Sequence, residues 1–142
     1  MALDQRLSFV TLGVTDLARA RAFCEQHGWV PRSRADDDVV VCQVGGLGVA
    51  LRDRGRLAED SAVPDPGGWG GITPAHTVRS PDEADVILQE VTRAGGRILR
   101  DAAATFRGGC SSMIADLDGQ PWEFTHNPFW TLDDSGAMLL GD

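Results

Sequence analysis

The sequence predicts an α+β fold built from two similar modules, each with the element order β-α-β-β-β. Two segments, Leu7–Val14 and Ile72–Val78, are apolar and β-branched, which is typical of strands. Each is followed by the pattern of an amphipathic helix and then by three short apolar runs. The two opening strands end 64 residues apart, at Val14 and Val78. This internal repeat predicts paired βαβββ modules, whose curved mixed sheets enclose a cleft and carry the helices outside.

The first module is expected over residues 5–53. Thr15 or Asp16 can cap a helix that runs to about His27, and Gly28 ends it. Three strands should follow, over Trp29–Arg34, Val39–Val44 and Leu47–Asp53. The next stretch, residues 54–71, is rich in Gly and Pro, so we expect a linker or a flap with no regular element.

The second module is expected over residues 72–126, and it contains the clearest helix start in the chain. Ser80 and Glu83 form a capping box, and Pro81 stands at the first helical position. Three strands should follow the helix, over Arg97–Asp101, Cys110–Asp116 and Gln120–His126.

The C-terminal tail, residues 127–142, carries apolar side chains such as Phe129 and Trp130. A free tail of this composition would expose those side chains to water, so it should dock on its own domain or on a second subunit. Modules, linker and tail together should form a single domain over residues 1–142, because this length is usual for one domain.

The composition excludes several function classes. All 13 basic residues are arginine, and the chain has no lysine and no tyrosine, so Schiff-base chemistry and acid–base catalysis by those side chains are impossible. A net charge of −8 opposes binding to nucleic acids and to anionic membranes. The three cysteines form no CxxC pair, the first residues do not resemble a signal peptide, and no apolar run is long enough for a membrane span. We therefore expect a cytoplasmic protein.

Two motifs resemble the vicinal oxygen chelate superfamily of glyoxalases, bleomycin resistance proteins and extradiol dioxygenases. They are Phe9–Leu17, which runs into the first helix, and Ala115–Phe124, with Gly95–Ile98 between them as the turn after the second helix. The likeness covers about residues 5–130, and it implies the paired-module fold and a homodimer. Since the superfamily hosts many activities, it does not fix the reaction.

The resemblance also implies one metal ligand on each of four strands, and the matching positions are Phe9, Leu51, Thr73 and Glu123. Only Glu123 could bind a divalent cation, which needs several oxygen or imidazole ligands at once. We therefore expect no metal, no cofactor, no catalytic centre of the glyoxalase or dioxygenase kind, and a closer likeness to the metal-free bleomycin-resistance-like members. By strand alternation, His76 should face the helices as a hydrogen-bonded core histidine.

A cleft without metal ligands suits a bulky, partly aromatic small molecule with a cationic or flat aromatic group. The residues expected to line it are Phe9, Thr11, Leu51, Trp69, Thr73, Ala75, Phe106 and Glu123. Trp122 and Phe124 should belong to the core, and Met113 could face either way. The leading hypothesis is a non-enzymatic protein that sequesters a natural product or drug, as in antibiotic resistance.

Two other functions stay open. A metal-independent enzyme, of isomerase or tailoring type, could use Glu123 as acid or base, since poor hydration would raise its pKa. Alternatively, Glu123 only hydrogen-bonds an arginine, a backbone amide or a ligand amine. A pure interaction module would bind its partner through Phe129 and Trp130.

Overall fold

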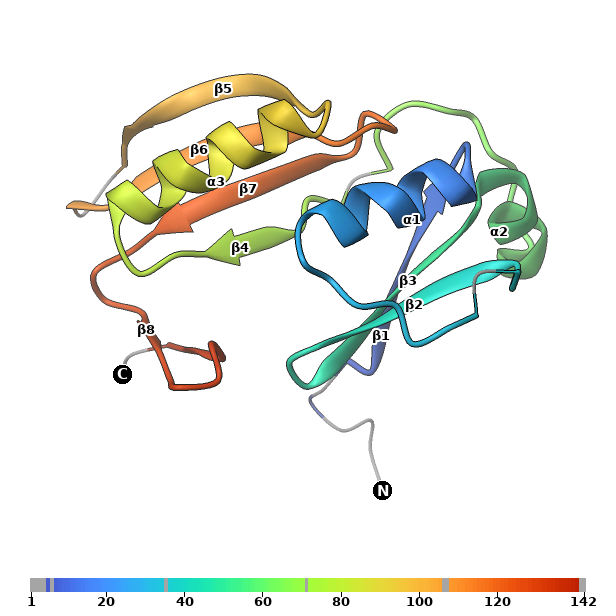
Figure 1. Cartoon of the computed structure of the whole chain (residues 1–142), viewed down its shortest axis with the longest axis horizontal. Helices are drawn as coiled ribbons and strands as arrows, with labels where there is room; N and C mark the ends of the chain where they lie inside the picture. Colours follow the sequence, from blue (N-terminus) through green and yellow to red (C-terminus); the bar gives the residue numbers. More distant parts are fainter. Residues whose placement is uncertain (1–4, 6, 35, 71, 106–107, 141–142) are drawn as a thin grey trace. The chain divides into compact units, whose positions relative to one another are not determined.

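The computed structural model describes the chain except residues 1–4, 6, 35, 71, 106–107 and 141–142. It forms two compact units, Met1–Pro66 and Gly67–Asp142, drawn in Figure 1. Each unit has a mixed sheet with a helix packed against it, which confirms the predicted α+β class. Within the described residues, no helix is both long enough and apolar enough to cross a membrane.

The first unit contains a three-stranded sheet in the order β1-β3-β2. Its strands are β1 (Phe9–Val14), β2 (Val39–Val44) and β3 (Leu47–Asp53), with β1 parallel and β2 antiparallel to the central β3. The predicted helix is confirmed as α1 (Leu17–Gln26). The Asp16 side chain caps it by accepting a hydrogen bond from the Arg19 amide at 3.0 Å.

The strand predicted over Trp29–Arg34 is wrong. Only an isolated bridge between Pro31 and Cys42 forms there. Pro31 has no amide hydrogen to donate to a ladder. The Val41 amide donates instead to the Ser33 hydroxyl at 3.1 Å, so a side chain takes the place of one ladder bond.

A helix, α2 (Arg54–Ser61), occupies the first half of the stretch predicted to have no regular element. The glycines and prolines that suggested a linker mostly follow Val63, and the helical part has only Gly55. The Asp53 carboxylate starts the helix by accepting a hydrogen bond from the Arg56 amide at 3.1 Å. Ala62 ends it in the left-handed conformation, with φ of 57°.

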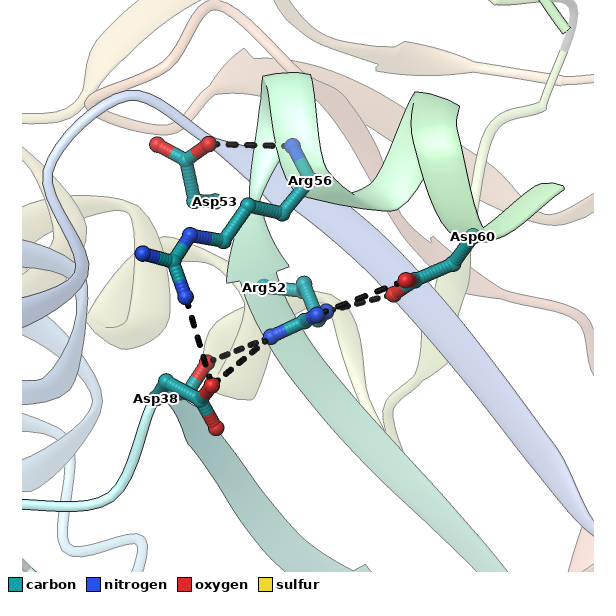
Figure 2. Close-up of polar contacts among 5 residues, drawn as sticks. All are labelled: Asp38, Arg52, Asp53, Arg56 and Asp60. Atoms are coloured by element: carbon teal, nitrogen blue, oxygen red, sulfur yellow. Dashed lines mark hydrogen bonds and ion pairs between the residues drawn. The ribbon is translucent and has the colours of Figure 1, made fainter. Parts of the chain in front are cut away.

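An arginine on β3 ties α2 to the sheet, as Figure 2 shows. Arg52 Nε lies 2.6 Å from one Asp60 oxygen and Nη2 lies 3.4 Å from the other, so the contact is bidentate. Arg52 Nη1 also donates to the backbone oxygen of Asp38 at 3.2 Å, and Arg56 Nη1 lies 3.4 Å from the Asp38 carboxylate. The hydrogen bond from Arg52 lowers the pKa of Asp60 from its ordinary value.

Replacement of Asp60 by Asn should make the stability of the protein less dependent on pH. Because the folded-state pKa of Asp60 is lowered, its ionised form stabilises the fold above the unfolded-state pKa, and this contribution disappears as the pH falls through the folded-state pKa. Urea unfolding should therefore show a small loss for Asp60→Asn at neutral pH and a smaller one near pH 3. A constant difference at both pH values would contradict the role of this ion pair.

The second unit contains a four-stranded sheet in the order β4-β7-β6-β5. The strands are β4 (Ala75–Thr77), β5 (Arg97–Ala104), β6 (Cys110–Ala115) and β7 (Pro121–His126). The helix α3 (Pro81–Arg93) begins as predicted, with the Ser80 hydroxyl accepting from the Glu83 amide at 3.2 Å. β4 is shorter than expected, because Pro74 cannot donate to the ladder and contributes only its oxygen, which accepts from the Glu123 amide at 2.9 Å.

The tail forms a small hairpin of β8 (Thr131–Leu132) and β9 (Met138–Leu139), which pair antiparallel. In Figure 1 the tail leaves β7 at its carboxyl end and turns back near the carboxyl end of β4. Arg79 Nη2 donates to the backbone oxygen of Asp133 at 3.2 Å, and the Thr77 hydroxyl lies 3.6 Å from the Met138 sulfur. The tail therefore contacts the unit from which it extends.

Candidate functional site

The two faces of the second sheet have different chemistry. One face packs against α3 and includes Ser112, Ile114 and Phe124, which are 1 %, 2 % and 8 % exposed. The opposite face we call the open face. It carries Ala75, Thr77, Arg100, Ser111, Met113, Glu123 and Thr125, which the strand register places opposite one another.

A chain of hydrogen bonds crosses the open face from β5 to β7. Arg100 donates to the Ser111 hydroxyl oxygen at 2.9 Å and to the Ser111 backbone oxygen at 3.2 Å. The Ser111 hydroxyl donates in turn to Glu123 Oε2 at 2.7 Å. Because Ser111 is 4 % exposed and has one hydroxyl hydrogen, this arrangement commits that hydrogen to the glutamate.

Glu123 keeps one oxygen available for a ligand. Its carboxylate is half-buried, and Oε1 accepts no hydrogen bond from the residues that the structure describes. Ala75 of β4 and Met113 of β6 lie directly opposite Glu123 in the two ladders. An acceptor between two apolar neighbours can bind a donor group, above all a cationic one, that is attached to an apolar body.

Sequence reasoning found Glu123 and Ala75 but missed Arg100 and Ser111. Strand alternation alone could have placed Ser111, once β6 was paired with β7. It could not have placed Arg100, since the pairing of β5 with β6 shifts register on both sides of this residue.

On the first sheet, Phe9 and Thr11 point to the face opposite the buried Leu12 and Val14. The Phe9 ring lies over Gly48, where a β-carbon would collide with it. Phe9 is nevertheless 58 % exposed, so the ring has a free side.

Leu51 does not share the face of Phe9 and Thr11, which corrects the expected set of lining residues. It pairs with Leu12 of β1 and Val40 of β2, and all three are buried. The residue that pairs with Thr11 is Ala50. Ala50 therefore takes the position in the first module that Glu123, opposite Ala75, has in the second.

Three other residues, Trp69, Thr73 and Phe106, were also predicted to line the cleft. Trp69 is 66 % exposed and donates its ring N–H to the Ile72 oxygen at 3.2 Å. Thr73 is exposed and lies outside any strand. Phe106 lies outside the described residues. Their part in ligand binding stays a prediction.

His76 faces the α3 side of its sheet, as predicted, and its ring meets Phe124 edge-on with centroids 5.8 Å apart. The expectation that it is a buried core residue is wrong. β4 is an edge strand of three residues, so one flank of His76 has no neighbouring strand.

The donor set does not fit a metal centre. With Ala50 in place of Leu51, the four positions that the family resemblance implies carry Phe9, Ala50, Thr73 and Glu123, and only the last has a carboxylate or imidazole to offer a hard cation. Among the described residues, no group of three or more His, Cys, Asp or Glu side chains could hold a metal ion.

Comparison with known proteins identifies the family. Residues 6–124 match the model of the Glyoxalase/Bleomycin resistance protein/Dioxygenase superfamily, so the chain belongs to this family. The family that the two motifs indicated is thereby confirmed. A search of curated proteins gives no match.

Solved structures of similar fold come from several bacteria. A glyoxalase-related enzyme from Fulvimarina pelagi is 33 % identical, with a TM-score of 0.87 over 97 % of this chain and 99 % of its own. A hypothetical protein from S. aureus is 22 % identical, with a TM-score of 0.75 over 88 % and 95 %. A lactoylglutathione lyase from Agrobacterium tumefaciens is 19 % identical, with a TM-score of 0.68 over 87 % and 95 %. The last two likenesses concern the fold alone.

Replacement of Ser111 by Ala should destabilise the second unit. The substitution leaves the Arg100 and Glu123 side chains without their shared partner at a buried position, which should lower the free energy of unfolding by about 1–2 kcal/mol. Urea denaturation measures this loss. Ser61→Ala, at the exposed end of α2, is the matched control and should change stability by less than about 0.5 kcal/mol. Equal effects of the two substitutions would contradict a structural role for the Ser111 hydroxyl.

Proposed function

We propose that this protein is a metal-independent binder of small molecules, which sequesters a bulky, partly aromatic natural product or drug. The observation that carries the proposal is the hydrogen bonding of the Glu123 carboxylate. One of its oxygens is held by Ser111, the other accepts nothing from the described residues, and the facing residues are apolar. This arrangement suits recognition of a ligand cation by charge and hydrogen bonding, with apolar contact beside it.

The chemistry of the open face also supports a particular kind of ligand. Arg100 donates to Ser111 through Nη1 and Nη2, and Glu123, which pairs with Met113 on the opposite side, is the acceptor that a ligand meets there. An amine or amidinium attached to a flat ring system would satisfy Glu123 and cover the apolar side chains. Antibiotic resistance is the biological role that we infer for such a binder, and a homodimer is the assembly that we infer from the family resemblance.

Binding should depend on the charge of Glu123. We expect calorimetry to find saturable binding within a panel of cationic glycopeptides, quinone and polycyclic antibiotics, flavins and the cationic acridine dye proflavine. Glu123→Gln preserves the shape and removes the charge, so it should raise the Kd of a cationic ligand about tenfold or more. It should have little effect on an uncharged one.

The matched control is Glu90→Gln, which removes the same charge from an exposed position on α3. It should leave every Kd within about twofold of the original value. Failure of the whole panel to bind, or equal losses in both variants, would overturn the proposal.

A metal-independent enzyme is the second candidate, because the Fulvimarina pelagi structure at 33 % identity is described as a glyoxalase-related enzyme. In this case Glu123 would accept a proton from a bound substrate at Oε1 and return it to a neighbouring carbon or oxygen. The overall step is an isomerisation that consumes no other reactant.

An exchange experiment in heavy water distinguishes the isomerase from the non-enzymatic binder. An isomerase should introduce deuterium into a panel compound in heavy water, detected by mass spectrometry, and Glu123→Gln should slow this exchange about 100-fold or more. Exchange that continues unchanged in the variant would rule out Glu123 as the base. A ligand that binds and gains no deuterium would favour the binder.

A further inference from the structure

We propose that the C-terminal hairpin is a wall of the small-molecule site, in which Met138 contacts the aromatic body of a ligand held by Glu123. This inference rests on the proposed function and adds a specificity-determining residue to it. It starts from the contact between the Thr77 hydroxyl and the Met138 sulfur, at 3.6 Å.

The register of β4 and β7 links this contact to Glu123. Thr77 pairs with Thr125, and Ala75 pairs with Glu123, so these side chains form two adjacent rows on the open face. Two residues of a strand span about 7 Å, which is close to the width of a fused aromatic ring system. A flat ligand whose cation reaches Glu123 would therefore extend toward Met138.

The hairpin is held at this place by several contacts within its own unit. Arg79 donates to the Asp133 backbone oxygen at 3.2 Å. Asp133 Oδ1 accepts from the Ser135 amide at 2.9 Å and from the Ala137 amide at 3.0 Å, which closes the loop between β8 and β9. The loop therefore has a defined shape before any ligand binds.

Apolar side chains in the hairpin and just before it are partly exposed. Met138 is 42 % exposed and Trp130 is 37 % exposed, although both lie in a segment with specific polar contacts. Methionine suits an aromatic ligand, because its thioether is polarisable and its side chain adapts to the shape of a ring. Glu123 supplies the charge and Met138 supplies the apolar contact, so the occupant that fits both is a flat aromatic cation.

Methionine methyl groups give a direct test, because the chain has only three methionines, Met1, Met113 and Met138. Carbon-13 labelling of these methyls should give three NMR signals, assigned with Met113→Leu and Met138→Leu. On titration with proflavine to about 1 mM, we expect the signals of Met113 and Met138 to shift together with one Kd. Met138→Ala should weaken proflavine binding about three- to tenfold.

The control variant is Leu139→Ala, since adjacent residues of β9 point in opposite directions. It should leave the Kd within about twofold of the original value. A shift of Met113 without a shift of Met138 would overturn this inference and leave the proposed function intact. The absence of a saturable shift of either signal would also overturn this inference, whereas the proposed function is overturned only if the whole panel fails to bind.

Discussion

The register of β7 within the second sheet is the constraint on which the candidate site depends. β7 lies between β4 and β6, and its two ladders place Phe124 opposite His76 and Ser112 on the face that packs against α3. The same ladders place Glu123 on the other face. A slip by one residue would bury the carboxylate under the helix and expose the phenyl ring, which is costly on both counts. Burial of an apolar side chain thus fixes the position of the polar one.

The turn before β7 adds a second restraint on this register. Asp116 Oδ1 accepts from the Asp118 amide at 2.9 Å and from the Gln120 amide at 3.0 Å, and Oδ2 accepts from the Trp122 ring N–H at 3.1 Å. Burial raises the pKa of Asp116 in spite of these three hydrogen bonds. This carboxylate holds the turn through two backbone amides and orients the side chain of Trp122 near the start of β7. The motif that revealed the family is therefore also the segment that aligns Glu123.

Local signals in the sequence were sufficient to predict where a helix begins when a single side chain caps it. Asp16, one of the two candidate caps, begins α1, and Ser80 begins α3 as predicted. Alternation along β7 assigned Glu123 and Phe124 to opposite faces correctly. The wrong predictions have two sources. One is a composition taken over a long segment, and the other is a strand register that the local sequence does not determine. The composition of residues 54–71 hid α2, because all the glycines and prolines of this stretch except Gly55 follow Val63, after the helix has ended. Leu51 was placed one residue away from Ala50, since register between distant strands follows from tertiary pairing. The bulges of β5 hid Arg100 for the same reason.

The two modules share a backbone pattern, as the internal repeat predicts, but they carry different side chains at equivalent positions. In both units an opening strand pairs parallel with a later strand, and the equivalent pairs are Thr11 with Ala50 and Ala75 with Glu123. The family resemblance implies one metal ligand at each of four matching positions, and in this chain Glu123 is the carboxylate among them. The Ser111 hydroxyl, which accepts from Arg100, donates to one oxygen of Glu123 and leaves the other as an acceptor. A position that the resemblance implies for metal coordination thus carries a hydrogen-bond acceptor in this chain, which is why we propose a ligand with a cationic donor group.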